Sequence, residues 1–311
     1  MARKGIELDD RQQNVYLNLR NQISKTARHN RQGAFKTKTR YFEATDRFCR
    51  FLSKEFSLQK FANIGDKHLK AYVKHLQNQG LAAKTINTDL SAIRFFHDKT
   101  ERTRNRLSDR NKIFGTEKVK NGGINKAWSH QEVDRFQEVC GQMGNKRMAA
   151  ITTLARNEGL RIHETLKIDR NAAEKAIKTG EITTKGKGGK VRLVPISSES
   201  KQLLSRWIED VERGQKLFVA EGEKTHLVIK SCQNFINRHR EKFQDESRTE
   251  QYAAGDPIKE NITFHGLRHA YAQDRYAEAK ERGLRDRDAR LEVSRLLGHE
   301  RDEVTRIYMA H

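Results

Sequence analysis

The chain has 311 residues, with 62 Lys and Arg against 41 Asp and Glu, so its formal net charge is +21. Such an excess attracts polyanions, first of all the continuous phosphate track of a nucleic acid, although charge alone leaves an acidic protein or a membrane surface open. The sequence has no apolar run near the roughly 20 residues that cross a bilayer, and its start lacks the apolar core of a secretion signal.

The first third of the chain is predicted to be helical. Apolar residues recur there at helical spacing, as with Val15, Leu19 and Ile23 at i, i+4 and i+8. A basic loop is expected over residues 29–40, and Gly80 stands where a helix would stop. The predicted helices span residues 9–29, 39–56, 66–80 and 81–100.

A second region of regular structure is predicted to start at Ser129. Glu132 follows Ser129 by three positions, which is the capping-box pattern of a helix start. Residues 181–196 alternate and are β-branched on both sides of a Gly-rich turn, which predicts a hairpin. Further helices are expected over residues 198–212 and 230–243, a polar surface loop over 244–261, and helix again to the end.

These elements predict a mainly α fold with one small β-hairpin, because only two prolines are present to interrupt helices. The three cysteines are isolated and odd in number, which indicates neither a disulfide framework nor a metal site and fits a reducing cytoplasm or nucleoid. The chain divides into an N-terminal helical extension at residues 1–33, a helical module at 34–115, a linker at 116–127 and a second domain at 128–311.

Four short segments of the second domain carry residues that suit phosphate chemistry. They are GLRIHE with Arg161, KGKGGKVRLVP with Lys187, FHGLRHA with His265 and Arg268, and LLGHERDEVTRIY with His299 and Tyr308. Each motif is weak alone, because such short patterns also arise by chance. Residues three apart in one helix share a face, so His265 and Arg268 can meet one ligand. Two forked guanidinium groups, those of Arg161 and Arg268, suit the non-bridging oxygens of a phosphate.

Tyr308 is a poor nucleophile at neutral pH, because a free phenol has a pKa of about 10. It needs positive surroundings and a nearby base, which the Arg and His residues can supply. In one straight helix, Tyr308 would lie opposite His299 and about 13.5 Å along the axis. A break near residues 298–302 is therefore required if both serve one site, with Gly298 permitting the turn and Asp302 capping the next helix.

Taken together, these segments resemble the tyrosine site-specific recombinases, the phage integrase family, over residues 35–308. The shared features are the order Arg, Lys, His-x-x-Arg, His, Tyr and the phrases GLRIHE, GKGGKVRLVP and HGLRHA. AKTINTDLSAIRFF in the first module is similar to the family's core-binding domain. The resemblance implies a helical core-binding domain and a mixed α/β catalytic domain that form a C-shaped clamp around DNA. It also implies cleavage and rejoining through a 3′-phosphotyrosyl intermediate and a Holliday junction, without metal or other cofactor.

The resemblance further implies a role for each residue of the catalytic set, which is Arg161, Lys187, His265, Arg268, His299 and Tyr308. The two arginines would clamp the scissile phosphate, and His299 would donate a hydrogen bond to it. Lys187, or Lys185 as its alternative, would protonate the departing 5′ oxygen. His265 would assist deprotonation of Tyr308, the nucleophile.

Phosphate contacts outside the catalytic set are expected in the helical module, where a merely solvated basic face is the alternative. The residues predicted to bind DNA are Lys36, Lys38, Arg40, Lys84, Thr85 and Arg94. The implied partner is double-stranded DNA with a specific recombination site, on which four copies would assemble. Accessory DNA-bending proteins are a further expected partner class, and no membrane is involved.

Several alternatives stay open from the sequence. A type IB topoisomerase uses similar chemistry, and a catalytically silent DNA-binding regulator is a third candidate, although every predicted catalytic position is filled. The task, whether integration, excision, resolution or inversion, is not decided. Three residues follow Tyr308, where many family members carry a segment that docks onto a neighbouring protomer. The helix at residues 9–29 is one candidate for that docking.

Overall fold

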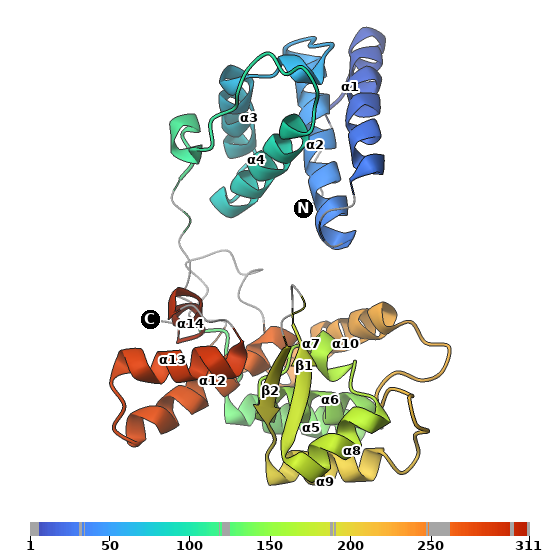
Figure 1. The fold of residues 1–311 in the computed structure, drawn as a ribbon, viewed down its shortest axis with the longest axis vertical. Helices are drawn as coiled ribbons and strands as arrows, with labels where there is room; N and C mark the ends of the chain where they lie inside the picture. The colour runs from blue at the N-terminus through green and yellow to red at the C-terminus, as the bar shows by residue number, and fades with distance from the viewer. Residues whose placement is uncertain are drawn as a thin grey trace. The chain divides into compact units, whose positions relative to one another are not determined.

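The computed structural model forms two compact units, Met1–Lys120 and Asn121–His311 (Figure 1). It describes residues 6–30, 33, 35–117, 119, 125–186, 189, 191–246, 248, 262–298 and 302–309, without the side chains of 302–304. Each unit is mainly helical and has its own hydrophobic core. Within these described ranges, no helix combines the length and the apolar character needed to span a bilayer.

The first unit contains four α-helices and two 3-10 turns among the described residues. They are α1 (Asp10–His29), α2 (Phe35–Glu55), η1 (Phe61–Asn63), α3 (Asp66–Asn78), α4 (Ala83–Asp98) and η2 (Asn111–Phe114). The first helix begins with a capping box between Asp9 and Gln12, and Gly80 has a φ of +71° just after α3. The four predicted helices are therefore present, and the glycine stop is confirmed.

The predicted basic loop at residues 29–40 is partly wrong. Helix α2 starts at Phe35, so Lys36, Lys38 and Arg40 lie on a helix rather than on a loop. The break between α1 and α2 is confined to a few residues around Gly33, which has a φ of +84°. Lys and Arg are good helix formers, and without an internal proline the helix extends back toward that glycine.

Helix α1 is part of the core of the first unit. Its apolar face, with Val15, Leu19 and Ile23, is buried in one cluster with residues of α2 such as Phe48. The Tyr16 hydroxyl also donates a hydrogen bond of 2.9 Å to the Asp46 carboxylate on α2. These contacts fix α1 against α2 by both apolar packing and a polar bond.

The described residues of the second unit form helices and one β-hairpin. Its described elements are α5 (His130–Gln142), α6 (Lys146–Glu158), α7 (Ile162–Thr165), α8 (Arg170–Thr179), β1 (Glu181–Lys185), β2 (Val191–Pro195), α9 (Ser198–Trp207), α10 (Thr225–His239), η4 (Arg240–Lys242), α12 (Phe264–Glu281), α13 (Asp286–Leu297) and α14 (Asp302–Met309). The strands pair antiparallel, with the buried Ile182 opposite the buried Val194, which confirms the predicted hairpin.

Two predicted helix boundaries differ from the structure. Helix α9 ends at Trp207, short of the predicted 212, because Glu209 and Asp210 would place two negative charges at the negative end of the helix dipole. Helix α10 starts at Thr225, five residues earlier than the predicted 230. Most of the predicted surface loop at 244–261 lies outside the described residues.

The chain breaks before the terminal helix as predicted. Helix α13 stops at Leu297, and Gly298 adopts the left-handed conformation with a φ of 68°. Helix α14 then begins at Asp302, which is its first helical residue. An added Cβ at Gly298 would lie 2.8 Å from the side chain of Arg192, so both the backbone angle and the close packing favour glycine here.

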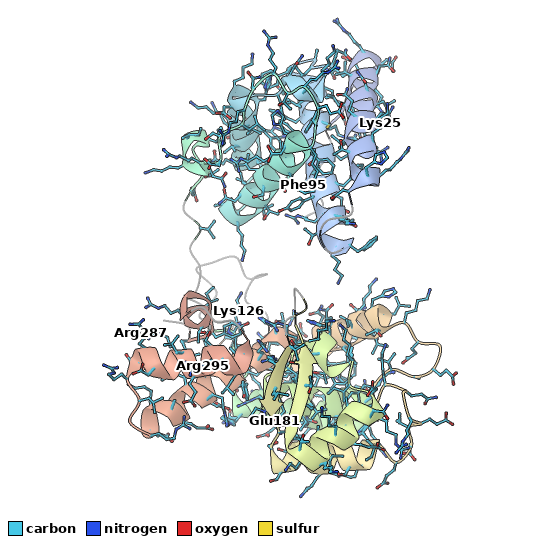
Figure 2. All side chains as sticks on the ribbon, viewed as in Figure 1. Lys25, Phe95, Lys126, Glu181, Arg287 and Arg295 are labelled. Atoms are coloured by element: carbon cyan, nitrogen blue, oxygen red, sulfur yellow. The ribbon has the colours of Figure 1, made fainter. Side chains whose placement is uncertain are left out.

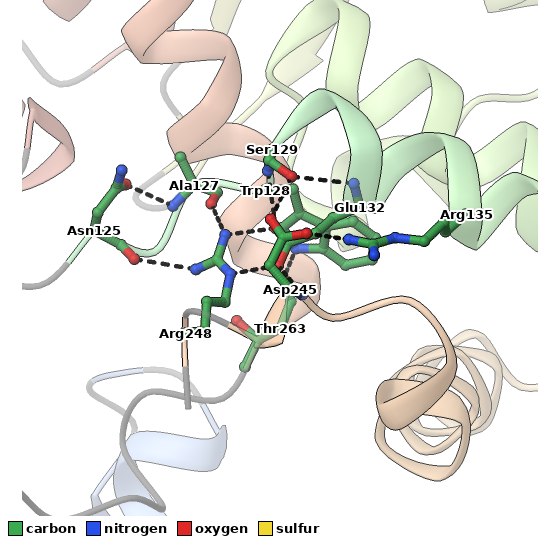
Figure 3. A network of polar contacts seen from close by, with 9 residues as sticks. All are labelled: Asn125, Ala127, Trp128, Ser129, Glu132, Arg135, Asp245, Arg248 and Thr263. Carbon is green, nitrogen blue, oxygen red and sulfur yellow. Dashed lines mark hydrogen bonds and ion pairs between the residues drawn. The ribbon is translucent and has the colours of Figure 1, made fainter. Parts of the chain in front are cut away.

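A buried carboxylate holds the start of the second unit in place (Figure 3). Glu132 has no exposed side-chain surface and accepts hydrogen bonds from the backbone N–H groups of Ser129, at 2.8 Å, and of Asp245, at 3.0 Å. The Arg248 guanidinium donates to the same carboxylate at 2.6 Å and also to the carbonyl oxygen of Ala127. The expected capping box between Ser129 and Glu132 is therefore present within a larger ion-pair network.

We expect Glu132→Ala to lower the free energy of unfolding by about 3 kcal/mol, because it leaves the guanidinium of Arg248 and two N–H groups without their shared acceptor. Urea denaturation followed by circular dichroism measures this change. Glu246→Ala, at an exposed position, is the matched control and should change stability by less than about 0.5 kcal/mol. Equal stability of the two variants would contradict the structural role of Glu132.

Candidate active site

Helix α12 carries three of the residues that gather at the candidate site, His265, Arg268 and His269. Its first turn is fixed by the lead-in segment, residues 125–129, through which the chain enters the second unit. The indole Nε1 of Trp128 donates a 2.8 Å hydrogen bond to the carbonyl oxygen of Thr263. The backbone of this segment lies so close to the helix that a Cβ at position 266 would sit 2.3 Å from a carbonyl oxygen, so the residue there is glycine.

Tyr308 on α14 meets two histidines of α12. Its hydroxyl lies 3.3 Å from Nε2 of His265. Its ring stacks on that of His269, with the ring centroids 4.3 Å apart and the planes at 27°. Tyr308 is 6% exposed and belongs to an apolar cluster with Leu297 and Met309, whereas His265 remains accessible to solvent. The phenol is thus held in one place beside a ring nitrogen.

Both histidines are neutral near pH 7. Partial burial of the ring and the positive charges of Arg268, Arg161 and Lys126 lower the pKa of His265 to about 4. Burial and neighbouring cationic groups likewise lower the pKa of His269 to about 3. A neutral imidazole offers a lone pair, so His265 is in the right form to accept the proton of the phenol.

A buried carboxylate, Glu164 on α7, organises two arginines. Arg161 precedes α7 and places its Nη1 2.9 Å from Oε1 of Glu164, while its backbone N–H donates to Oε2 at 2.8 Å. Arg192 on β2 donates from Nη2 to Oε2 at 2.9 Å. Burial would raise the pKa of Glu164, but Arg192, the Arg161 backbone N–H, and the charges of Arg268 and Arg161 together lower it. Glu164 therefore stays ionised and acts as the structural partner of these cations.

Arg268 lies beneath this pair and is 1% exposed. Its guanidinium donates to the carbonyl oxygens of Gly159 and Leu297, and Nη1 lies 3.9 Å from Oε2 of Glu164. Burial and the charges of neighbouring arginines lower the pKa of Arg268 to about 10, which leaves it cationic at neutral pH. Three guanidinium groups around one carboxylate give the site a net positive charge suited to a phosphodiester.

The structure brings together four of the six predicted catalytic residues: Arg161, His265, Arg268 and Tyr308. Lys187 and His299 lie outside the described residues. Lys185, the alternative to Lys187, is the last residue of β1, at the base of the same hairpin turn. The choice between these two lysines therefore stays a prediction.

The residues predicted to bind DNA form two separate groups on the first unit. Rings of Tyr41 and Phe95 contact each other, and Arg47 pairs with Asp89 at 3.1 Å, so α2 and α4 run antiparallel. The first turns of the two helices are therefore at opposite ends of the pair. Lys36, Lys38 and Arg40 lie at one end, and Lys84 and Thr85 at the other.

Not all of these side chains face solvent. Lys36, Arg40 and Lys84 are exposed. Lys38 donates to the carbonyl oxygen of Asn30 at 2.9 Å, and Arg40 lies 3.7 Å from the buried Asp89. Arg94 donates to the carbonyl oxygen of Ser108 at 2.7 Å and covers the ring of Phe114, which gives it a structural role within the unit.

Sequence reasoning missed two members of the site. Arg192 lies within the quoted phrase KGKGGKVRLVP, and its pairing opposite Thr184 on the hairpin is the only signal of an inward-facing cation. His269 is the second of these residues, and its ring stacks on that of Tyr308. No cluster of His, Cys, Asp or Glu that could hold a metal ion occurs among the described residues.

Comparisons with known proteins identify the family. The family model "Phage integrase family" matches residues 126–311, and "Phage integrase, N-terminal SAM-like domain" matches residues 19–105. The chain is 26% identical over 294 residues to the tyrosine recombinase XerC of Lacticaseibacillus casei, which covers 90% of this chain and 91% of that protein.

Two solved structures share the fold. One is the Tn1549 transposon integrase in complex with transposon right end DNA, with a TM-score of 0.64, 15% identity and 94% of each chain covered. The other is a lambda integrase dimer bound to a COC′ core site, with a TM-score of 0.61, 15% identity, and 98% of this chain and 82% of that chain covered. The family model spans more than half of the chain and includes every predicted catalytic residue. The protein therefore belongs to the phage integrase family and is a tyrosine recombinase, an enzyme that breaks and rejoins DNA strands in site-specific recombination.

Proposed function

We propose that Tyr308 is the nucleophile of this recombinase and that His265 is the base that receives its proton. The observation that carries the proposal is the 3.3 Å approach of the Tyr308 hydroxyl to Nε2 of a neutral His265. The proposal extends to Arg161 and Arg268, whose positive charges lower the pKa of that same imidazole.

The proposed reaction balances without a cofactor. The Tyr308 oxygen attacks the scissile phosphorus while its proton passes to His265, and the bond from phosphorus to the 5′ oxygen breaks. Lys187, with Lys185 as the alternative, gives a proton to the departing 5′ oxygen. The product is a 3′-phosphotyrosyl ester and a free 5′ hydroxyl. Attack of a 5′ hydroxyl from another strand reverses these steps and rejoins the DNA.

Charge stabilisation is assigned to the arginines. The side chain of Arg161 is 26% exposed and so can contact a non-bridging oxygen of the phosphate directly. Arg268 is buried behind it and adds a second positive charge where the dielectric constant is low, which strengthens its effect on a developing negative charge. His299 is proposed as a further hydrogen-bond donor to the same phosphate.

The proposed partner is double-stranded DNA with a specific recombination site. Basic side chains are spread over both units, as Figure 2 illustrates. We further propose that four copies act on two synapsed sites through a Holliday junction, in the nucleoid, with accessory DNA-bending proteins. The name of the transposon integrase with the same fold supports integration or excision of a mobile element as the task.

We expect Tyr308→Phe to abolish covalent adduct formation on a nicked suicide substrate that carries the cognate site, because the attacking oxygen is removed. Denaturing gel electrophoresis detects the adduct, and a binding assay should show affinity for the intact site within about twofold of the unchanged chain. An undiminished adduct yield in this variant would assign the nucleophile to another residue.

The pH dependence of cleavage tests His265. A histidine with a pKa of about 4 is already neutral at pH 5, so its ability to accept a proton is present above that pH and is lost only as the pH falls through about 4. The second-order rate constant of adduct formation, which reports groups of the free enzyme, should therefore show no inflection near 6.5. An inflection near that value that disappears in His265→Gln would contradict the assignment.

Two exposed lysines test the DNA surface of the first unit. We expect the double variant Lys36→Ala/Lys84→Ala to bind DNA more weakly and to reduce the magnitude of the slope of log affinity against log salt by about 2, one for each lost phosphate contact. Lys54→Ala/Lys60→Ala, which removes two exposed lysines outside the predicted set, should leave the slope unchanged. Equal slopes for the two double variants would remove Lys36 and Lys84 from the interface.

A further inference from the structure

The terminal helix α14 depends on contacts with the rest of the second unit for its position. It has eight residues, Asp302–Met309, and helices of that length are only marginally stable in isolation. Tyr308 lies in its last turn, where backbone carbonyl groups have no partner further along the helix. The side-chain amide of Gln273 on α12 supplies a partner, donating a 3.0 Å hydrogen bond to the carbonyl oxygen of Tyr308, and His269 also forms a hydrogen bond with the Tyr308 backbone.

The same amide group reaches the lead-in segment. Nε2 of Gln273 lies 2.9 Å from Oδ1 of Asn125. An NH₂ group has two hydrogens, so one goes to each oxygen and both are used. Oδ1 of Asn125 also accepts the backbone N–H of Ala127 at 3.0 Å, which fixes the orientation of the Asn125 amide. Both N–H groups of the Gln273 amide and the backbone N–H of Ala127 therefore each have an acceptor oxygen.

The lead-in segment is itself firmly anchored. The guanidinium of Arg248 donates to the backbone carbonyl oxygens of Asn125, at 3.2 Å, and of Ala127, and it pairs with the buried Glu132 (Figure 3). A continuous series of hydrogen bonds thus runs from a buried carboxylate, through Arg248 and Asn125, to Gln273 and the backbone of the nucleophile.

We propose that Gln273 is a positioning residue for the cleavage reaction, which rests on the proposed role of Tyr308. By bridging Asn125 and the Tyr308 carbonyl oxygen, its amide sets where α14 ends relative to α12 and hence where the phenol meets His265. Catalysis is sensitive to such placement, because a displacement of about 1 Å from the reactive geometry costs on the order of a hundredfold in rate. Gln273 touches no reacting atom and acts through the backbone of Tyr308.

The arrangement also makes the position of the nucleophile depend on the lead-in segment. Asn125 lies near the start of the second unit, which begins at Asn121. A displacement of Asn125 breaks one of the two hydrogen bonds of the Gln273 amide. The amide can then rotate about its remaining hydrogen bond, to the Tyr308 carbonyl oxygen. The reactivity of Tyr308 therefore depends on the position of Asn125.

The test compares side chains of similar helix propensity at position 273. Gln273→Leu removes both donors, and Gln273→Glu keeps the shape but presents acceptors to two oxygens, whereas Gln273→Lys restores a donor that can reach them. We expect the first two to lower the single-turnover rate of adduct formation at saturating protein about tenfold, with DNA affinity within about twofold. Gln273→Lys should retain at least half of the original rate.

Asn125→Ala, which removes one arm and leaves the bond to Tyr308, should lower the rate about threefold. Thermal denaturation of each variant accompanies the kinetics, and the proposal requires the lysine and leucine variants to differ in rate while their melting temperatures agree. Equal rates for Gln273→Leu and the unchanged chain, or equal losses for leucine and lysine, would overturn the inference. Tyr308→Phe is measured in parallel. An adduct in that variant would refute the role of Tyr308 itself. If that variant forms no adduct, a negative result with the Gln273 variants refutes only the role of Gln273.

Discussion

The ion cluster around Glu164 is the interaction on which the rest of the site depends. Two arginines close to one another repel, and they stay together here because a buried, ionised carboxylate lies between them and a third guanidinium. Arg192 extends the cluster from the hairpin to the carbonyl oxygen of Leu296, and Arg268 extends it to Leu297. The cluster thus joins α7, β2 and the end of α13, from which the chain turns toward the nucleophile.

The geometry of the nucleophile follows from that anchor. Arginines on the last carbonyl groups of α13 satisfy its free acceptors and oppose the negative end of its dipole, so the helix stops at a defined residue. Gly298 then turns the chain, and α14 returns Tyr308 to the histidines of α12. The Tyr308 hydroxyl lies beside the neutral imidazole of His265, and the positive charges of Arg268 and Arg161 act on that ring. In the proposed reaction the imidazole would take the proton, and the arginines would hold the phosphate.

The same segments serve stability and chemistry at once. The hydrogen bond of Trp128 and the lack of a side chain at position 266 let the lead-in segment pack against the first turn of α12. Glu132 holds the same segment through its ion pair with Arg248. Residues that take no part in the proposed chemistry therefore determine the positions of His265 and Tyr308. In the first unit, by contrast, Lys36 and Lys84 are exposed, and their proposed contribution to DNA binding would depend on charge and spacing alone.

The amino-acid sequence by itself determined the helical class, the hairpin, the capping box at Ser129 and the break before the last helix, and it predicted the residue types of the catalytic set, because all of these are local patterns. The predicted start of α2, end of α9 and start of α10 differ from the structure, because helix ends depend on neighbouring charges and packing as well as on local pattern. Only the tertiary structure decided that Glu164 gathers three arginines, that His269 stacks on Tyr308, and that Gln273 bridges Asn125 to the terminal helix. These contacts join residues as far as 148 positions apart, and burial sets both their strength and the pKa values of the two histidines. Neither separation in space nor burial can be read from a local pattern of residues.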